Sequence, residues 1–219
     1  MWHITAMKFR DMLALLGQEP LFETGLLLAG AVNQADIQRQ LSRWVQTKRI
    51  YQLRRGLYTI APPYQKVAPH PFLVANRMVR GSYVSCQTAL AYYGLIPEYV
   101  AITISVTTQR PGNWTTPVGH YQFRHIKSAL FTGYQRIEVI QGQWVYIARP
   151  EKALLDLAYL YPGADDPAYL QELRLQNLDN IDVDKLWKLA ENSCSPKLQR
   201  VGKYIAQMAQ QEKMDYEIL

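Results

Sequence analysis

A row of polar side chains that could bind nucleic acid lies in the N-terminal third of the chain. Its members are Gln34, Gln38, Arg39, Ser42 and Arg43. Glutamine can form two hydrogen bonds with adenine, arginine can form two with guanine, and serine can reach base edges or phosphate. Asp36 is the only acid among them, whereas a solvated helix surface more often carries glutamate–lysine pairs. We expect this row to contact bases or phosphates. The plainer alternative is a polar surface that faces only water.

The apolar residues between these side chains predict a helix. Ile37, Leu41, Trp44 and Val45 follow one another at spacings that place them on one side of a helix. Asn33 is a favourable N-cap, and Asp36 follows in the first turn. Residues 7–16 and 24–29 predict two earlier helices, with a tight turn at 30–32 before the third. Because the first residues of a recognition helix usually enter the major groove most deeply, those at the start of the row are the leading candidates.

A short hairpin is predicted directly after this helix. Residues 50–53 and 57–60 are rich in β-forming types, and Gly56 supplies the positive φ that the turn between them needs. Arg54 and Arg55 occupy the tip, where they could bind phosphates or enter a minor groove. Alternatively, their charges only protect the edge of a sheet. Helices followed by a basic hairpin predict a winged helix-turn-helix, which binds double-stranded DNA.

Charge is concentrated in the same part of the chain. The whole protein carries +6, whereas residues 1–80 hold eleven Lys/Arg and four Asp/Glu, a balance of +7. A locally basic domain is typical of proteins that bind a polyanion, because cationic side chains release counterions from the phosphates. Charge alone would fit a solvated surface equally well, so the prediction depends on charge and helix together.

The domain boundaries follow from the prolines. Pro62, Pro63, Pro69 and Pro71 predict a linker at 62–71 between a DNA-binding domain, 1–61, and a C-terminal domain, 72–219. In the second domain, helices are expected at 72–80 and 86–93, and strands at 101–108, 121–125, 135–140 and 144–148. Further helices are expected after Pro150, Asp182 and Ser195. The expected fold class is α/β (α+β): a winged helix, then a small, mostly antiparallel sheet with C-terminal helices.

Five segments in this order resemble the AbiEi-type antitoxins. They are RRGLYTI, GSYVSCQTALAYYGLIP, ISVTTQRPG, YQFRHI and IARPEKALLDLAYL. The resemblance covers roughly residues 8–160, and the N-terminal segment Met1–Ala6 extends beyond the family's usual start. Members of the family are transcriptional regulators of phage-defence toxin–antitoxin systems. The resemblance implies binding to inverted repeats in the protein's own promoter. It also implies that the C-terminal domain counteracts a toxin with a nucleotidyltransferase fold.

An enzymatic C-terminal domain is the main alternative. Glu151 and Lys152 are superficially similar to the acid–lysine pair of a metal-dependent nuclease, but no aspartate lies on the preceding hairpin. We expect Glu151 to favour the helix start, Lys152 to be solvated, and Asp156 to pair with it one turn later. Gly81-Ser82 is similar to the start of a nucleotidyltransferase motif, yet no Asp-x-Asp follows nearby. The expectation is a protein that is not an enzyme. A third class would be a winged helix used only for protein contacts.

The β-rich part of the second domain is a candidate partner surface. Residues 101–150 carry five Lys/Arg and one glutamate, a balance of +4, whereas residues 151–219 balance at −4. Arg124, Lys127 and Arg136 are the residues that we expect to face an acidic partner or RNA. Ordinary scatter of surface charge is the alternative.

Composition excludes several other classes. Cys86 and Cys194 are the only cysteines and form no CxxC motif, so we expect reduced thiols rather than a disulfide framework or a zinc site. The four histidines lack metal-ligand spacing, and no glycine-rich phosphate loop occurs, so no cofactor is expected. No apolar run reaches the roughly 18 residues of a membrane span, and the first residues do not resemble a secretion signal. A cytoplasmic protein is expected.

Overall fold

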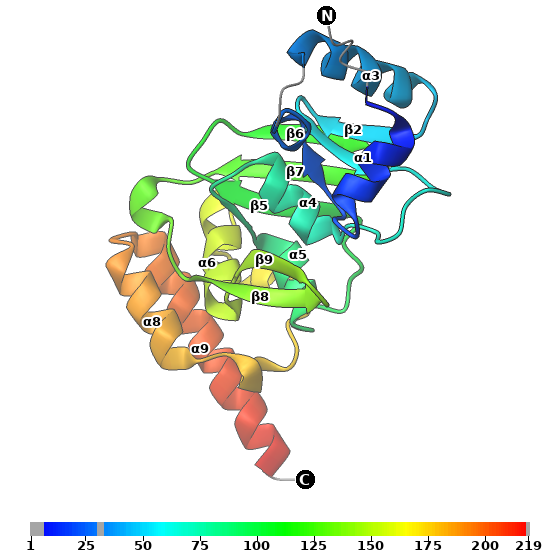
Figure 1. The fold of residues 1–219 in the computed structure, drawn as a ribbon. Coiled ribbons are helices and arrows are strands. Elements are labelled where there is room, and N and C mark those ends of the chain that lie inside the picture. Colours follow the sequence, from blue (N-terminus) through cyan, green and yellow to red (C-terminus); the bar gives the residue numbers. More distant parts are fainter. Residues whose placement is uncertain (1–6, 30–32, 218–219) are drawn as a thin grey trace, which may run out of the picture.

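The chain folds as a mixed α/β protein with two β-sheets (Figure 1). The structure is a computed structural model that describes residues 7–29 and 33–217, with side chains up to Met214. The turn expected at 30–32 and the N-terminal segment 1–6 lie outside the described residues. Within the described part of the chain, none of the helices combines the length and apolar character that crossing a membrane requires.

The N-terminal unit places helices around a three-stranded antiparallel sheet. Its elements are α1 (Phe9–Leu16), β1 (Phe22–Glu23), α2 (Thr24–Leu27), α3 (Gln34–Gln46), β2 (Ile50–Arg54) and β3 (Leu57–Ile60). The sheet order is β1-β3-β2, so the first short strand covers one edge of the hairpin. The predicted third helix and the hairpin are confirmed, whereas the two residues of β1 were too short to show a period in the sequence.

Local chemistry explains where α3 and the hairpin begin and turn. The Asn33 side chain accepts a hydrogen bond from the Ala35 N–H at 2.8 Å, which satisfies an amide that the helix itself leaves unpaired. Gly56 has φ 81°, a conformation that a residue with a Cβ rarely adopts, and it turns the chain from β2 into β3. The apolar side of α3 then packs into a core with α1 and the sheet. Members of this core include Met12, Leu16, Phe22, Leu27, Ile37, Leu41, Trp44 and Ile50.

The second unit contains the larger sheet. Its helices are α4 (Pro71–Met78), α5 (Cys86–Tyr92), α6 (Pro150–Leu160), α7 (Pro167–Glu172), α8 (Val183–Asn192) and α9 (Pro196–Glu217). Its strands are β4 (Ser82–Val84), β5 (Ile102–Thr107), β6 (Gly112–Thr116), β7 (Gly119–His125), β8 (Tyr134–Ile140) and β9 (Gln143–Ala148). Two short 3₁₀ turns lie at Ser128–Leu130 and Leu178–Asn180.

The six strands form a mixed sheet in the order β6-β7-β5-β4-β9-β8. Neighbours β6–β7, β5–β4 and β9–β8 are antiparallel, whereas β7–β5 and β4–β9 are parallel. Antiparallel pairs are therefore the majority, although the sheet is larger than the small one expected. Strands β4 and β6 were not predicted, because three residues at β4 are buried without alternation and β6 is only partly buried.

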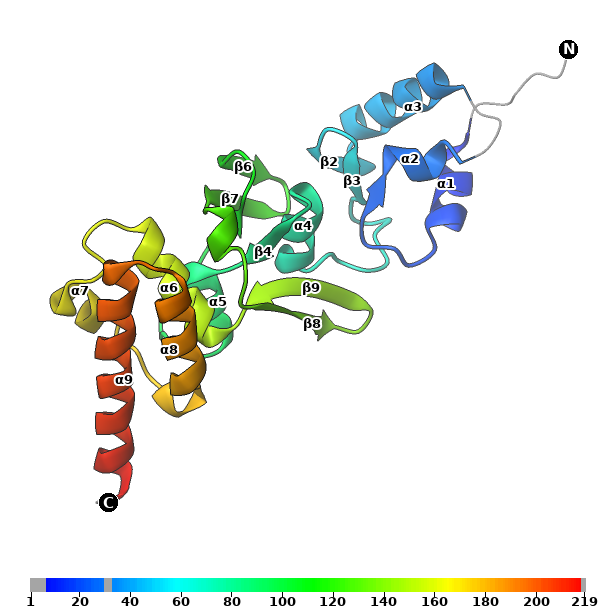
Figure 2. The same cartoon turned by 90° about the vertical axis from the view of Figure 1, so that its left-hand side faces the viewer.

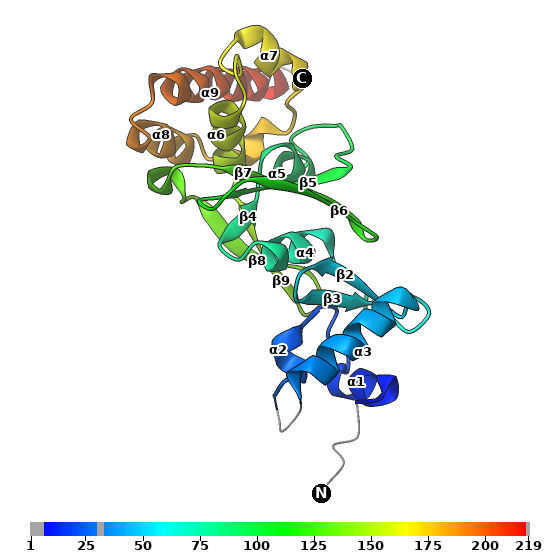
Figure 3. The same ribbon diagram turned by 90° about the horizontal axis from the view of Figure 1, so that it is seen from above.

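Helix α4 lies between the large sheet and the N-terminal unit. It packs against β4, β5 and β9. Helices α6, α8 and α9 lie on the other side of the sheet, as two views at right angles show (Figures 2 and 3). Pro71 starts α4, so the linker that was expected to include this residue ends one position earlier. The Asn76 side chain also hydrogen-bonds the backbone N–H of Tyr146 at 2.6 Å, which anchors α4 on β9.

Three leucines of the N-terminal unit are buried with the second unit rather than with their own. Leu21, Leu53 and Leu57 are each 4% exposed and belong to the large core that also contains Phe72 and Met78 of α4. One side of the hairpin is therefore covered by the second unit. Removing this apolar surface from water contributes to holding the two units together.

Replacing Leu57 with alanine should destabilise the protein by about 2–5 kcal/mol, because the smaller side chain leaves a cavity at the junction. The free energy of unfolding in urea measures this loss. Leu15 is the matched control: it is 53% exposed on α1, so Leu15→Ala should cost less than about 0.5 kcal/mol. Equal costs for the two variants would contradict a packed junction.

Candidate nucleic-acid interface

Helix α3 separates its two kinds of side chain cleanly. Ile37, Leu41 and Trp44 are buried, and Val45 is half-buried. All members of the polar row are exposed, which are Gln34, Gln38, Arg39, Ser42 and Arg43. Nothing in the described part of the chain covers this side of the helix, and α3 lies at the end of the molecule away from the C-terminal helices (Figure 1). The row is thus open to a large ligand.

Arg39 has one partner on its own helix. Its guanidinium forms an ion pair and hydrogen bond with the Asp36 carboxylate one turn earlier, and the Arg39 side chain is 76% exposed. Exposed ion pairs of this kind contribute roughly 0–1 kcal/mol. The pair therefore orients Arg39 without preventing the guanidinium from exchanging Asp36 for another acceptor.

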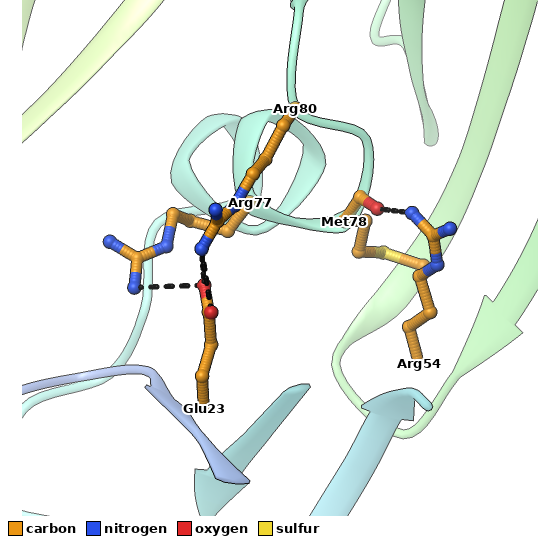
Figure 4. Close-up of polar contacts among 5 residues, drawn as sticks. All are labelled: Glu23, Arg54, Arg77, Met78 and Arg80. Atoms are coloured by element: carbon orange, nitrogen blue, oxygen red, sulfur yellow. Dashed lines mark hydrogen bonds and ion pairs between the residues drawn. The ribbon is translucent and has the colours of Figure 1, made fainter. Parts of the chain in front are cut away.

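The two arginines of the hairpin differ in their surroundings. Arg54 was expected to bind phosphates or to enter a minor groove. It is exposed, and its guanidinium donates a hydrogen bond to the Met78 carbonyl oxygen at the end of α4 (Figure 4). Arg55 is exposed at the turn and forms no ion pair among the described residues. Of the two, Arg55 is therefore the one placed to reach a phosphate, and Arg54 links the hairpin to the second unit.

Arg77 and Arg80 contribute to the positive charge of residues 1–80, but the sequence predicted no site for them. In the structure they lie at and just beyond the end of α4, and both face Glu23 of the N-terminal unit (Figure 4). Arg80 Nη2 donates to both Glu23 oxygens at 2.7 and 2.6 Å, and Arg77 Nη2 lies 3.5 Å from Glu23 Oε1. The partners are 57 residues apart along the chain, so no local pattern could have shown this cluster.

The candidate partner residues of the second unit do not form one patch. Arg124 is on β7 and packs over the Tyr161 ring at 5.3 Å, and Arg136 is on β8 and packs over the Trp144 ring at 4.7 Å. Three strands lie between β7 and β8, so four inter-strand spacings of about 4.8 Å separate them, roughly 19 Å in all. Lys127 precedes the 3₁₀ turn after β7. Arg124 and Lys127 thus belong to the end of β7 and the segment directly after it, whereas Arg136 lies on a distant strand.

The acid–lysine motif of α6 is part of the protein core. Lys152 was expected to be solvated, but its side chain is only 6% exposed and pairs with Asp156, which is 1% exposed. Asp156 also accepts hydrogen bonds from Ser85 Oγ at 2.6 Å and Tyr83 Oη at 3.0 Å. Lys152 and Asp156 are buried because the apolar residues beside them on α6 pack into the core, which removes this whole helical turn from water.

Glu151 has a second role that the sequence did not indicate. It is 4% exposed, and its carboxylate accepts a hydrogen bond from the Asp182 N–H at 2.8 Å. It thereby fixes the start of α8, where the Asp182 side chain in turn accepts a hydrogen bond from the Lys185 N–H at 3.0 Å. Among the described residues, no group of three or more His, Cys, Asp or Glu side chains is arranged to hold a metal ion.

Burial controls the ionisation of the groups around Asp156. It raises the pKa of the Asp156 carboxyl, against the opposing effects of Lys152, Ser85 and Tyr83. It likewise raises the pKa of the Cys86 thiol, so this thiol stays protonated. A buried, protonated thiol is a poor nucleophile.

Comparison with models of known protein families gives no match, and comparison with curated protein sequences gives none either. The resemblance to AbiEi-type antitoxins therefore rests on the five sequence segments alone.

Replacing Lys152 with methionine should cost about 3–5 kcal/mol of stability, because it leaves a buried carboxylate without its counter-charge. Adding Asp156→Asn to the same protein should recover part of this loss, since the neutral amide can still accept from Tyr83 and Ser85. Chemical denaturation of both variants and the parent gives the comparison. A double variant no more stable than the single one would contradict a charge-based cost.

The loss in Lys152→Met should also depend on pH. The pKa of Asp156 is raised by burial, and without Lys152 it rises further, so the folded variant binds a proton that the unfolded chain releases. Stability of the variant therefore falls as pH rises from the unfolded value of about 3.9 through the folded pKa. The deficit relative to the parent should be smaller in mildly acidic buffer than at neutral pH.

Proposed function

We propose that the N-terminal unit is a winged helix-turn-helix that binds double-stranded DNA, with α3 as the recognition helix and β2–β3 as the wing. The observation that carries this proposal is the exposed polar row of α3 above its buried apolar side. An uncovered row made of glutamine, arginine and serine matches the hydrogen-bonding groups of base edges and phosphates.

The dimensions of α3 suit this role. Its 13 residues span about 20 Å at 1.5 Å each, and the helix fits a major groove about 12 Å wide. Gln34, Gln38 and Arg39 in its first half would contact base edges. Ser42 and Arg43 would follow the groove toward the phosphates, and Arg55 at the wing tip would bind the backbone.

For the whole protein, we propose a transcriptional autorepressor and antitoxin of an AbiE-like system. The five segments that resemble AbiEi-type antitoxins support this assignment, together with the basic N-terminal unit. The protein would bind inverted repeats in its own promoter and counteract a nucleotidyltransferase-like toxin through its C-terminal unit, without catalysis of its own. Promoter binding and toxin neutralisation would both take place in the cytoplasm.

Gln38→Ala or Arg39→Ala should change sequence preference rather than DNA binding in general. Each lost base contact should cost about 1–3 kcal/mol on the promoter and much less on random duplex. Titration of purified protein with its own upstream DNA and with a scrambled duplex of equal length measures both affinities.

Arg55→Ala is the matched control for these variants, because it removes one exposed cation outside the recognition helix. Arg55→Ala should weaken binding to both duplexes equally and should reduce the dependence of affinity on salt. Equal losses on promoter and scrambled DNA from the α3 variants would reject the roles assigned to Gln38 and Arg39. Absence of duplex binding by the parent protein would reject the proposed function.

The antitoxin activity can be tested at the candidate partner residues. Two sets of charge reversals are compared, Arg124→Glu with Lys127→Glu and, separately, Arg136→Glu. One of the two should reduce rescue from the co-expressed toxin, while promoter binding stays unchanged in both. Because the two sets lie near different edges of the sheet, only the set that faces the partner should have an effect. Full rescue by both folded variants would remove all three residues from the proposal.

A further inference from the structure

An open, strongly basic pocket lies where the wing tip meets the end of α4. Its volume is about 550 Å³, and the charged and polar side chains of its lining are Glu23, Thr24, Arg54, Arg55, Arg77, Arg80 and Gln109. Two of the arginines come from the N-terminal unit and two from the second unit. The pocket therefore exists only in the folded arrangement of both units.

Positive charge in this pocket exceeds what its own acid can neutralise. Four arginines line the pocket, and its lining contains a single carboxylate, that of Glu23. Arg80 holds both oxygens of Glu23, Arg77 approaches one of them, and Arg54 has only a backbone carbonyl as its partner. This excess of positive charge favours the binding of a further anion with several acceptor oxygens. Phosphate is such an anion, and arginine binds it through two parallel hydrogen bonds.

The pocket adjoins the surfaces already assigned to DNA. Gly56 of the wing tip accepts a hydrogen bond from the Thr24 N–H at 3.0 Å, which joins the start of α2 to the hairpin turn. Both residues line the pocket, and Arg55 lies at its border with solvent. Arg77 and Arg80 line the same pocket as Arg55, so they are within the surroundings of a duplex strand that contacts Arg55.

We propose that Arg77 and Arg80 bind a phosphate of the same DNA duplex, and that this phosphate displaces the Glu23 carboxylate from them. The inference rests on the proposed DNA-binding function and extends the contact surface into the second unit. The exchange is feasible because both arginines are well exposed, at 44% and 76%, and exposed ion pairs with carboxylates are weak. Phosphate contacts gain in addition from the release of counterions.

A purely structural role makes the opposite prediction for one residue. If the ion pairs with Glu23 only hold the two units together, Glu23→Gln should loosen the junction and leave DNA binding equal or weaker. If Glu23 competes with phosphate, Glu23→Gln should bind duplex several-fold more tightly. The sign of this single change therefore separates the two roles.

The experiment measures affinity of the full-length protein for its promoter duplex between about 50 mM and about 200 mM salt. For Arg77→Ala with Arg80→Ala, the slope of log affinity against log salt should become shallower by about 0.9, the value for the one phosphate that the two arginines bind together. The resulting loss of affinity should be about three- to fourfold larger at the low-salt end of this range than at the high-salt end. Glu23→Gln should strengthen binding.

Arg174→Ala with Arg200→Ala is the matched control. These arginines are 72% and 62% exposed and lie far along the chain from the pocket, and the double variant loses the same two charges. Its salt slope should equal that of the parent. Thermal unfolding of every variant checks that the fold is intact.

The outcomes separate the two proposals. Unchanged affinity and slope in Arg77→Ala with Arg80→Ala, or equal or weaker binding by Glu23→Gln, would overturn the phosphate site even if Gln38→Ala still alters sequence preference. In that case the winged helix alone would bind DNA. A parent protein that does not bind duplex would overturn both proposals.

Discussion

The packing of the hairpin against α4 is the contact on which the arrangement of this protein depends. Leu53 and Leu57 are buried in the core of the second unit, and α4 is itself held against the large sheet. One side of the hairpin is covered, whereas Arg55 at its tip and the polar row of α3 stay exposed. The same packing brings Arg77 and Arg80 next to the tip, so the two units share one basic surface.

Burial decides what each charged pair in this molecule can do. Glu23 with Arg80 and Asp156 with Lys152 each pair a carboxylate with a cation. The Arg80 side chain of the first pair is well exposed, whereas both members of the second pair are almost fully buried. Exposed pairs are screened by water and can exchange partners, whereas separating a buried pair leaves an uncompensated charge in the core. The first pair can therefore open to accept another ligand, whereas the second pair holds α6 in its place beneath the sheet.

The topology of the large sheet explains why charge along the sequence did not form one surface. Residues 101–150 are basic as a segment, yet their strands occupy both ends of the order β6-β7-β5-β4-β9-β8. Strand β4, which comes earlier in the chain, inserts between them. Arg124 and Arg136 consequently pack on different aromatic rings, Tyr161 and Trp144, rather than side by side.

The sequence alone determined the features that depend on neighbours along the chain. The spacing of Ile37, Leu41 and Trp44 gave α3 and its exposed row, and Gly56 between β-forming runs gave the hairpin, because helix periodicity and turn conformation are local properties. Only the tertiary structure decided that Arg54 turns toward Met78, that Lys152 is buried, and that Glu23 meets Arg80. Each of these depends on contacts between distant segments, which apolar packing creates and no local pattern encodes.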